Sequence, residues 1–200
     1  MRHVLSALII LGLTGCEAGL DGRGVRTLSM LEGAVSVRGP EGYCVDQQSS
    51  RPSSGFAVLA GCALVSDAAM MPTLEGLITV QIGSANSASV TGAEAELAGL
   101  LRTAQGAQLL SDAGNPASVQ VARVDRADGV VVVRFSDAAP APLPGLEPLE
   151  WRAFLDIRGR LTTISLRGFD RAPIPSDQGL RLLSQAIGTL RSANAPVPPT

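Results

Sequence analysis

The sequence predicts a single α+β domain, an antiparallel sheet with two helices packed on it. Two pairs of apolar, strand-like segments are each joined by a short turn that contains glycine, which is typical of antiparallel hairpins. Two other segments carry apolar residues at helical spacing, so each would present one apolar face to the sheet. Apolar residues make up 46% of the 200 residues and charged residues 17%, a composition that allows one substantial core.

Strands are expected along most of the chain, at residues 34–37, 43–46, 56–65, 77–82, 119–124, 130–135, 151–157 and 161–167. Segment 56–65 is apolar at both parities, which favours a central strand covered on both faces, and a buried helix is the alternative. Segment 151–157 is apolar at every second residue and pairs back on 161–167, the clearest hairpin. The polar residues 47–54 predict a loop, and the proline-rich residues 140–148 predict a rigid, extended connector.

Both helices carry recognisable end signals. Thr91 and Glu94 match a capping box, which would begin a helix that ends near Gln105. Ser176 would cap the last helix, which is expected to run to about Arg191 with a stripe of leucine and isoleucine facing the core.

The N-terminus carries the most specific signal in the chain. Three residues that include Arg2 precede an apolar run over residues 4–13, which is too short to span a bilayer and is typical of a secretory signal peptide. The following Leu13-Thr14-Gly15-Cys16 resembles the lipobox of bacterial lipoprotein precursors. The resemblance implies cleavage before Cys16, diacylglycerol on its thiol and acylation of the new amine, for example by palmitate. An ordinary signal peptide that happens to contain a cysteine is the alternative.

This resemblance sets the expected organisation and location. Residues 1–15 are a signal peptide, 16–27 a lipidated flexible tether rich in glycine and charge, 28–192 the α+β domain and 193–200 a disordered tail. The protein would be held at a membrane of the cell envelope and face the periplasm. Glu17 replaces the aspartate that retains enteric lipoproteins in the inner membrane, so the outer membrane is favoured over the inner one.

The two remaining cysteines predict a disulfide. With Cys16 assigned to lipid, Cys44 and Cys62 form an even pair in an oxidising compartment. A bridge that closes a loop of this size contributes roughly 3 kcal/mol in the chain-entropy treatment. A redox or metal pair is the alternative, although there is no Cys-x-x-Cys spacing and no histidine nearby.

Two missing residue types exclude much catalytic chemistry. The chain contains no lysine, and its single histidine, His3, lies in the predicted signal peptide. The mature chain therefore cannot use a Ser-His-Asp triad, a histidine-ligated zinc, a Schiff base or a Walker-type lysine. The formal charge of −2 becomes −3 once Arg2 is removed, which argues against nucleic acid as a partner.

Few residues remain as binding candidates. Met70 and Met71, in the predicted loop 66–76, could line an apolar pocket, but filling a gap in the core is the favoured interpretation. Asp125 and Asp128 lie in a predicted hairpin turn and lack the ligand spacing of an EF-hand, so a solvated turn is expected.

Arginines are the other candidates. Four of them lie on predicted strands and could converge on a carboxylate or phosphate, although a solvated sheet face is favoured: Arg123, Arg134, Arg152 and Arg167.

The order of elements over residues 28–192 resembles the PsbP/DcrB-like fold, which includes bacterial envelope lipoproteins. The resemblance carries no catalytic residue, and it implies an accessory or binding protein. We therefore expect a non-catalytic domain, without metal or cofactor, that binds a partner protein of the envelope. A module for a small apolar or acidic ligand, held between sheet and helices, is the alternative, and a serine- or carboxylate-based hydrolase is a distant third. A deep apolar pocket would favour the ligand module, and a shallow exposed patch would favour the partner.

Overall fold

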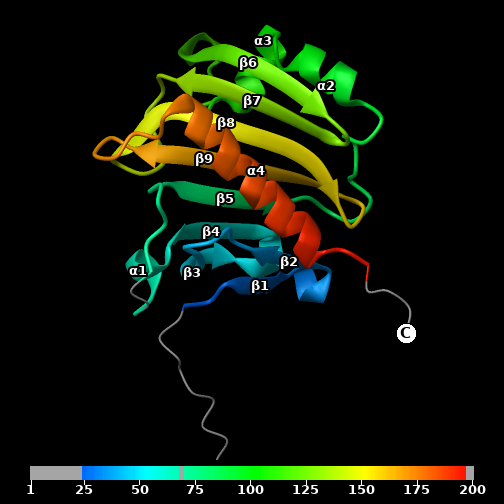
Figure 1. Cartoon of the computed structure of the whole chain (residues 1–200). Helices are drawn as coiled ribbons and strands as arrows, with labels where there is room; N and C mark the ends of the chain where they lie inside the picture. The colour runs from blue at the N-terminus through cyan, green and yellow to red at the C-terminus, as the bar shows by residue number, and fades with distance from the viewer. Residues whose placement is uncertain (1–23, 68–69, 197–200) are drawn as a thin grey trace, which may run out of the picture.

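The main sheet contains seven antiparallel strands, β3 (Tyr43–Arg51), β4 (Phe56–Gly61), β5 (Leu77–Ile82), β6 (Val119–Ala127), β7 (Val130–Asp137), β8 (Leu146–Ile157) and β9 (Arg160–Phe169). Their order across the sheet is β3-β4-β5-β9-β8-β7-β6 (Figure 1). The structure is a computed structural model that describes residues 24–67 and 70–196. The predicted signal peptide, Cys16 and most of the predicted tether lie outside the described residues.

Each face of the main sheet has its own cover (Figure 1). Helix α4 (Ser176–Ala193) crosses one face together with a two-stranded sheet made of β1 (Thr27–Met30) and β2 (Val35–Arg38). Helices α2 (Glu94–Leu100) and α3 (Ala104–Leu110) cover the β6–β7 side of the other face. We call these the α4 face and the α2–α3 face. The arrangement confirms the predicted α+β class.

Alternation along the strands sends successive side chains to the two faces. On β8, Trp151, Ala153 and Leu155 are buried in the core of the α4 face, which also holds Leu183 and Leu190 of α4. A smaller core lies under α2 and α3, formed by Ala98, Leu101, Leu110, Val124, Val131, Val133 and Phe135 with Val90. The two predicted hairpins are present as β6–β7 and β8–β9.

The apolar segment 56–65 was predicted to be one strand, and this prediction is wrong. Strand β4 ends at Gly61, and Cys62–Val65 form the short helix α1. Cys44 on β3 and Cys62 at the start of α1 form the disulfide that the cysteine count indicated. The apolar side chain of Leu64 is exposed as a result.

The predicted helix over 91–105 is also wrong in detail. The chain forms two seven-residue helices, α2 and α3, and the side chain of Thr103 caps the second by accepting from the backbone N–H of Gly106. The capping box does not form, because Glu94 accepts from the backbone N–H groups of Gly92 and Gly129 instead.

Three further predictions need correction. Strand β3 continues to Arg51 through most of the predicted loop 47–54, with an irregular register opposite β4. Pro175, not Ser176, occupies the N-cap of α4, and no side chain caps this end. Residues 193 and 194, expected in the tail, belong to the fold, because α4 ends at Ala193 and Asn194 is buried and donates through Nδ2 to the backbone C=O of Ser36 at 2.7 Å.

Candidate functional site: a groove along helix α4

An open groove of about 620 Å³ lies beside α4. One wall is the side of α4, and the other consists of the turn before β3 and residues 70–74. We call it the α4 groove. Its walls are made by Pro40, Glu41, Gly42, Tyr43, Met70, Met71, Pro72, Thr73, Leu74, Gln178, Arg181, Leu182, Gln185, Gly188 and Thr189.

Close backbone packing holds the outer wall of the groove in place. Gly42 has φ of +80° and lies so near Pro72 that an added Cβ would come within 2.7 Å of the proline Cα, so a side chain cannot be accommodated there. Tyr43 is fully buried, and its hydroxyl donates to the backbone C=O of Leu74 at 2.7 Å. The Cys44–Cys62 disulfide fixes the same region to β4 and α1.

Met70 and Met71 belong to this wall and do not fill the core. Their side chains are 46% and 40% exposed, so the favoured interpretation of the sequence was wrong. Pro72 and Met71 lie against Gly61, where an added Cβ would come within 2.9 Å of Pro72 Cδ and 3.1 Å of Met71 Sδ. Flexible, polarisable methionine at an exposed edge suits a surface that adapts to a partner.

The ionisable side chains along the groove are poorly suited to catalysis. Burial raises the pKa of the Tyr43 phenol far above its usual value, so it stays protonated at neutral pH. Arg181 is exposed and pairs with Asp177 at 2.8 Å. Glu41, an exposed residue of the turn before β3, is the remaining ionisable side chain among the described lining residues. The groove thus combines an outer wall with exposed methionines and a wall of mainly polar side chains on α4, a mixture that is found at binding surfaces.

The four candidate arginines do not converge. Arg152 and Arg167 lie on the α2–α3 face, on either side of Glu150, which is 1% exposed. Arg167 donates through Nε to Glu150 Oε2 at 2.6 Å and pairs with Asp112 at 2.6 Å, while Arg152 donates through Nε to Glu150 Oε1 at 2.7 Å. Burial lowers the pKa of Arg167, but the two carboxylates outweigh it and raise the pKa above its usual value. This neutral cluster ties the end of α3 to the sheet, and each of its four charged side chains is in an ion pair.

Arg123 and Arg134 lie on the opposite, α4 face, in neighbouring positions of β6 and β7. Arg123 pairs with Asp125 at 2.6 Å. Arg134 makes no ion pair with any described residue, and its buried Nε has no hydrogen-bond partner. Nε1 of the adjacent Trp151 is also buried without a hydrogen-bond partner among the described residues. These residues line a cavity of about 280 Å³ at the first turn of α4.

Within residues 24–67 and 70–196, no group of three or more His, Cys, Asp or Glu side chains could hold a metal ion. In the same part of the chain, none of the helices is both long enough and apolar enough to cross a bilayer.

No family model matches the sequence, and no curated protein is similar to it. Among solved structures, the chain is similar to a mutant of the protein Mog1, with 12% identity and a TM-score of 0.42 over 84% of this chain and 91% of that one. It is also similar to the Saccharomyces cerevisiae Ran-binding protein Mog1p, with 11% identity and a TM-score of 0.42 over 86% and 93%. The likeness concerns the fold alone.

Sequence reasoning missed most of the site. Most of the α4 residues that line the groove are polar or small and lie on the solvent side of the helix. Helical periodicity predicts only that such residues are exposed, and it does not indicate that they form a site. Glu150 and Asp112 were missed as partners of the arginines, because they lie 38 residues apart and only the folded sheet brings them together.

Proposed function

We propose that this protein is a lipid-anchored component of the bacterial cell envelope, preferably of the outer membrane, whose domain binds a partner protein in the α4 groove. The lipobox-like Leu13-Thr14-Gly15-Cys16 supports the anchor. The observation that carries the binding role is the groove itself, a long open hollow along α4 with two exposed methionines on its rim. A long open groove suits an extended segment of a partner better than a small enclosed ligand.

The proposal includes no catalytic step. The mature chain has no histidine or lysine, and in the described domain the other groups that could act as a base, a thiol, a phenol or a buried carboxylate, are engaged. Cys44 and Cys62 are joined, and Tyr43 donates to a backbone carbonyl. Of the buried carboxylates, Glu150 is fixed between two guanidinium groups and Asp137 accepts from two backbone N–H groups. A screen of residues 17–200 against esterase, phosphatase, peptidase and glycosidase substrates should show no turnover above a blank. Turnover that disappears when one Asp, Glu or Ser is replaced would overturn this part.

The anchor is tested by Cys16→Ser in the full precursor. Two or three acyl chains hold a domain on a membrane far more firmly than one, whose binding constant is only about 10⁴ M⁻¹. We expect the variant to be released from membranes or to remain unprocessed, while mass spectrometry of the parent shows an acylated Cys16. A variant that is still cleaved and membrane-bound like the parent would refute lipidation at this residue.

The groove is tested by site-specific photo-cross-linking in intact cells. A photoreactive residue at Gln185 faces the groove, and one at the neighbouring Ser184 is exposed but lies outside the groove lining. We expect one defined protein adduct from position 185 and none from position 184. Equal labelling from both positions would show that the groove is not the site.

A blocking variant adds specificity to this experiment. Gly188 lines the groove, and an added Cβ there meets nothing within 4 Å, so Gly188→Gln should fill the groove without disturbing the fold. Replacing glycine inside a helix should raise stability by up to about 1 kcal/mol. The adduct at position 185 should then disappear although the domain is at least as stable, whereas Ser184→Gln should leave it unchanged.

A small acidic ligand is the second candidate function, and the unpaired Arg134 favours it. Its guanidinium lines the cavity at the first turn of α4, where backbone N–H groups also favour an anion. Benzoate is a suitable probe, because it combines a carboxylate with an apolar ring. Under this alternative, benzoate raises the Tm of the parent and not that of Arg134→Met. No shift in the Tm of either protein would refute the small-ligand function.

A further inference from the structure

Three exposed apolar side chains gather at one edge of the domain. Leu64 on α1 is 53% exposed, and Met70 and Met71 just beyond it are 46% and 40% exposed. The backbone N–H of Ala63 donates to the C=O of Met70 at 3.0 Å, so the two segments lie side by side. Neither Cys62–Ser66 nor Met70–Thr73 contains a charged residue. We call Leu64, Met70 and Met71 the end patch.

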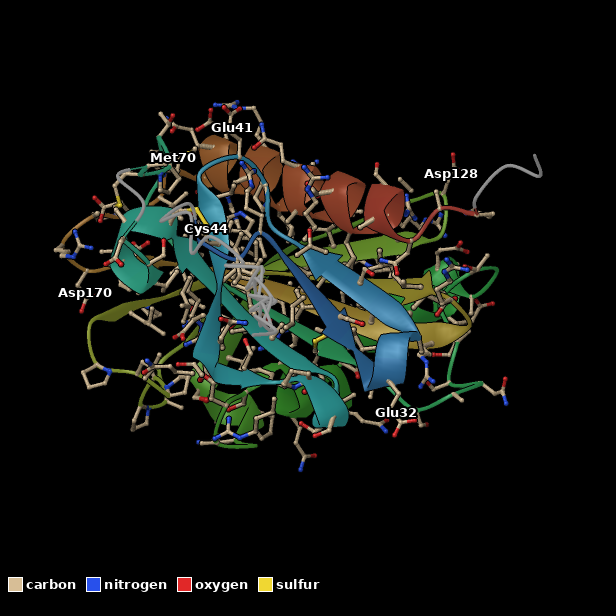
Figure 2. All side chains as sticks on the ribbon, turned by 90° about the horizontal axis from the view of Figure 1, so that it is seen from below. Glu32, Glu41, Cys44, Met70, Asp128 and Asp170 are labelled. Atoms are coloured by element: carbon tan, nitrogen blue, oxygen red, sulfur yellow. A yellow bond between two sulfur atoms is a disulfide. The ribbon has the colours of Figure 1, made fainter. Side chains whose placement is uncertain are left out.

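The N-terminal segment enters the fold at the same edge. A Cβ on Gly24 would lie 2.6 Å from Ser66 Oγ and 2.7 Å from Cys44 Sγ, so the first described residue rests on the disulfide and on the end of α1. The C=O of Val25 then accepts from the backbone N–H of Val45 at 2.7 Å. Figure 2 looks onto the domain from below, where Cys44 and Met70 are labelled and Met70 lies at the rim beside α1.

The distance along the chain from the predicted anchor to this edge is short. Gly24 lies eight positions after Cys16 in the chain, and a fully extended chain of that length spans at most roughly 29 Å. The opposite edge of the sheet, where α3 lies against β6, is six strand spacings away, again roughly 29 Å. A lipid on Cys16 therefore favours the α1 edge next to the bilayer, because the α3 edge could reach the bilayer only with these residues fully extended.

We propose that the end patch rests on the lipid surface and orients the domain with its α1 edge toward the membrane. This inference depends on the lipid anchor of the proposed function. The patch is held rigidly by the disulfide, by the contact between Ala63 and Met70, and by Ser66, whose hydroxyl donates to the C=O of Cys62 at 2.7 Å. Uncharged, apolar side chains on a fixed edge are suited to the interfacial region of a bilayer. Since Met70 and Met71 also line the α4 groove, a partner bound in the groove would lie close to the membrane.

Fluorescence quenching by brominated lipid tests the orientation in the full chain. Tryptophan is introduced singly as Leu64→Trp, Met70→Trp or, at the other edge, Leu109→Trp, which replaces a 62% exposed leucine on α3. The native Trp151 is 1% exposed and gives the same background in every variant. Each protein is purified with acylation at Cys16 verified by mass spectrometry and is reconstituted into phosphatidylcholine vesicles with and without brominated acyl chains.

We expect the variants at positions 64 and 70 to lose intensity in brominated vesicles and to emit at shorter wavelength, and the variant at 109 to show neither change. Acylated protein in which all three positions respond alike, or in which neither 64 nor 70 responds, would overturn the inference while leaving the anchor intact. A chain that carries no lipid on Cys16 would instead refute the proposed function, and the orientation with it. All three sites are exposed, and an unchanged thermal transition would show that the fold is retained.

Discussion

The two faces of the main sheet are closed by different kinds of interaction. Where α4 covers it, the α4 face is mainly apolar, and α4 packs its leucines on the cluster that contains Trp151. On the α2–α3 face, carboxylates of the sheet hold the connections around the helices. Asp156 accepts from the segment before α2, Asp137 accepts from the backbone N–H of Asp112 after α3, and Glu150 reaches Asp112 through Arg167.

The difference follows from the lengths of the helices. Helix α4 has 18 residues and buries a long apolar stripe, whereas α2 and α3 have seven residues each. Helices of that length are not stable alone and bury little apolar area, so polar contacts must position them. Apolar packing does not depend on protonation, but a carboxylate contact does. The two faces should therefore respond differently to mutation and to acid.

The largest expected effect comes from Glu150→Gln. The change removes the charge between Arg152 and Arg167 and leaves a buried cluster with an excess positive charge. Breaking a buried ion pair in this way costs about 3–5 kcal/mol. Urea denaturation should show a correspondingly lower free energy of unfolding.

The control for this experiment is Asp125→Asn, which breaks the exposed pair with Arg123. Because solvent screens that pair, its loss should leave the denaturation midpoint unchanged. Similar losses from the two variants would mean that the buried cluster has no special role on the α2–α3 face.

The next effect concerns the apolar packing of the α4 face. Gly179 lies against Trp151, and an added Cβ would come within 2.5 Å of the ring atoms Cε2 and Cζ2. Neither the helix backbone nor the buried indole has room to move, so Gly179→Ala should cost about 1–3 kcal/mol despite the better helix propensity of alanine. Gly188→Ala on the open side of α4 should instead stabilise by up to about 1 kcal/mol. If thermal denaturation shows that both variants stabilise, the contact between α4 and the sheet is looser than described.

Much of this architecture was predictable from periodicity. Alternating residues in 151–157 and leucines at helical spacing after Ser176 placed the β8–β9 hairpin and α4 correctly, because each reflects a long apolar face. The predictions failed where polar contacts from distant residues decide the structure. Glu94 accepts from the backbone N–H of Gly129 instead of capping its own helix, and β3 continues through an irregular polar stretch to Arg51, which pairs with Phe56 of β4.

The candidate site was less predictable for the same reason. Sequence singled out Met70 and Met71 but not their exposure, which depends on how Pro72 closes against Gly61. The sequence also indicated the four strand arginines as candidates, without separating those on the α4 face from those on the α2–α3 face. Their positions relative to buried neighbours contain that information: Arg152 alternates with Trp151 and Ala153, so it lies on the face away from them.

A smaller effect, and a pH dependence, is expected from Asp156. Burial tends to raise the pKa of its carboxyl, but hydrogen bonds from the backbone N–H groups of Ser89, Val90 and Thr91, at 2.9, 3.0 and 2.7 Å, outweigh it and lower the pKa. A lowered pKa in the folded state contributes stability that is present above the ordinary carboxyl value of about 3.9 and is lost as the pH falls through the folded value.

Asp156→Asn removes the charge but keeps one acceptor, so it should cost about 1–2 kcal/mol at neutral pH. The difference between parent and variant should shrink as the pH falls below the ordinary carboxyl value of about 3.9, where the unfolded chain takes up a proton first, and should vanish below the lowered pKa of the folded state. Amide hydrogen exchange would locate the effect, with faster exchange in α2 and α3 than in α4 as the pH is lowered. An acid response that begins in α4 would contradict the comparison of the two faces.

The smallest effect is expected from Arg134→Met. Of the two candidate strand arginines on the α4 face, Arg134 is the one that makes no ion pair with a described residue. Its buried Nε lacks a partner, so the folded protein already loses the hydration of that group without compensation. Methionine retains most of the aliphatic stem beside Trp151 and removes the unpaired donor, and the free energy of unfolding should change by less than about 0.5 kcal/mol. Arg152→Met is the matched variant on the α2–α3 face, and it should cost several times more because it takes a partner from the buried Glu150. Equal losses in urea denaturation would show that Arg134 carries an interaction of its own, and the ionic and apolar faces would no longer be distinct.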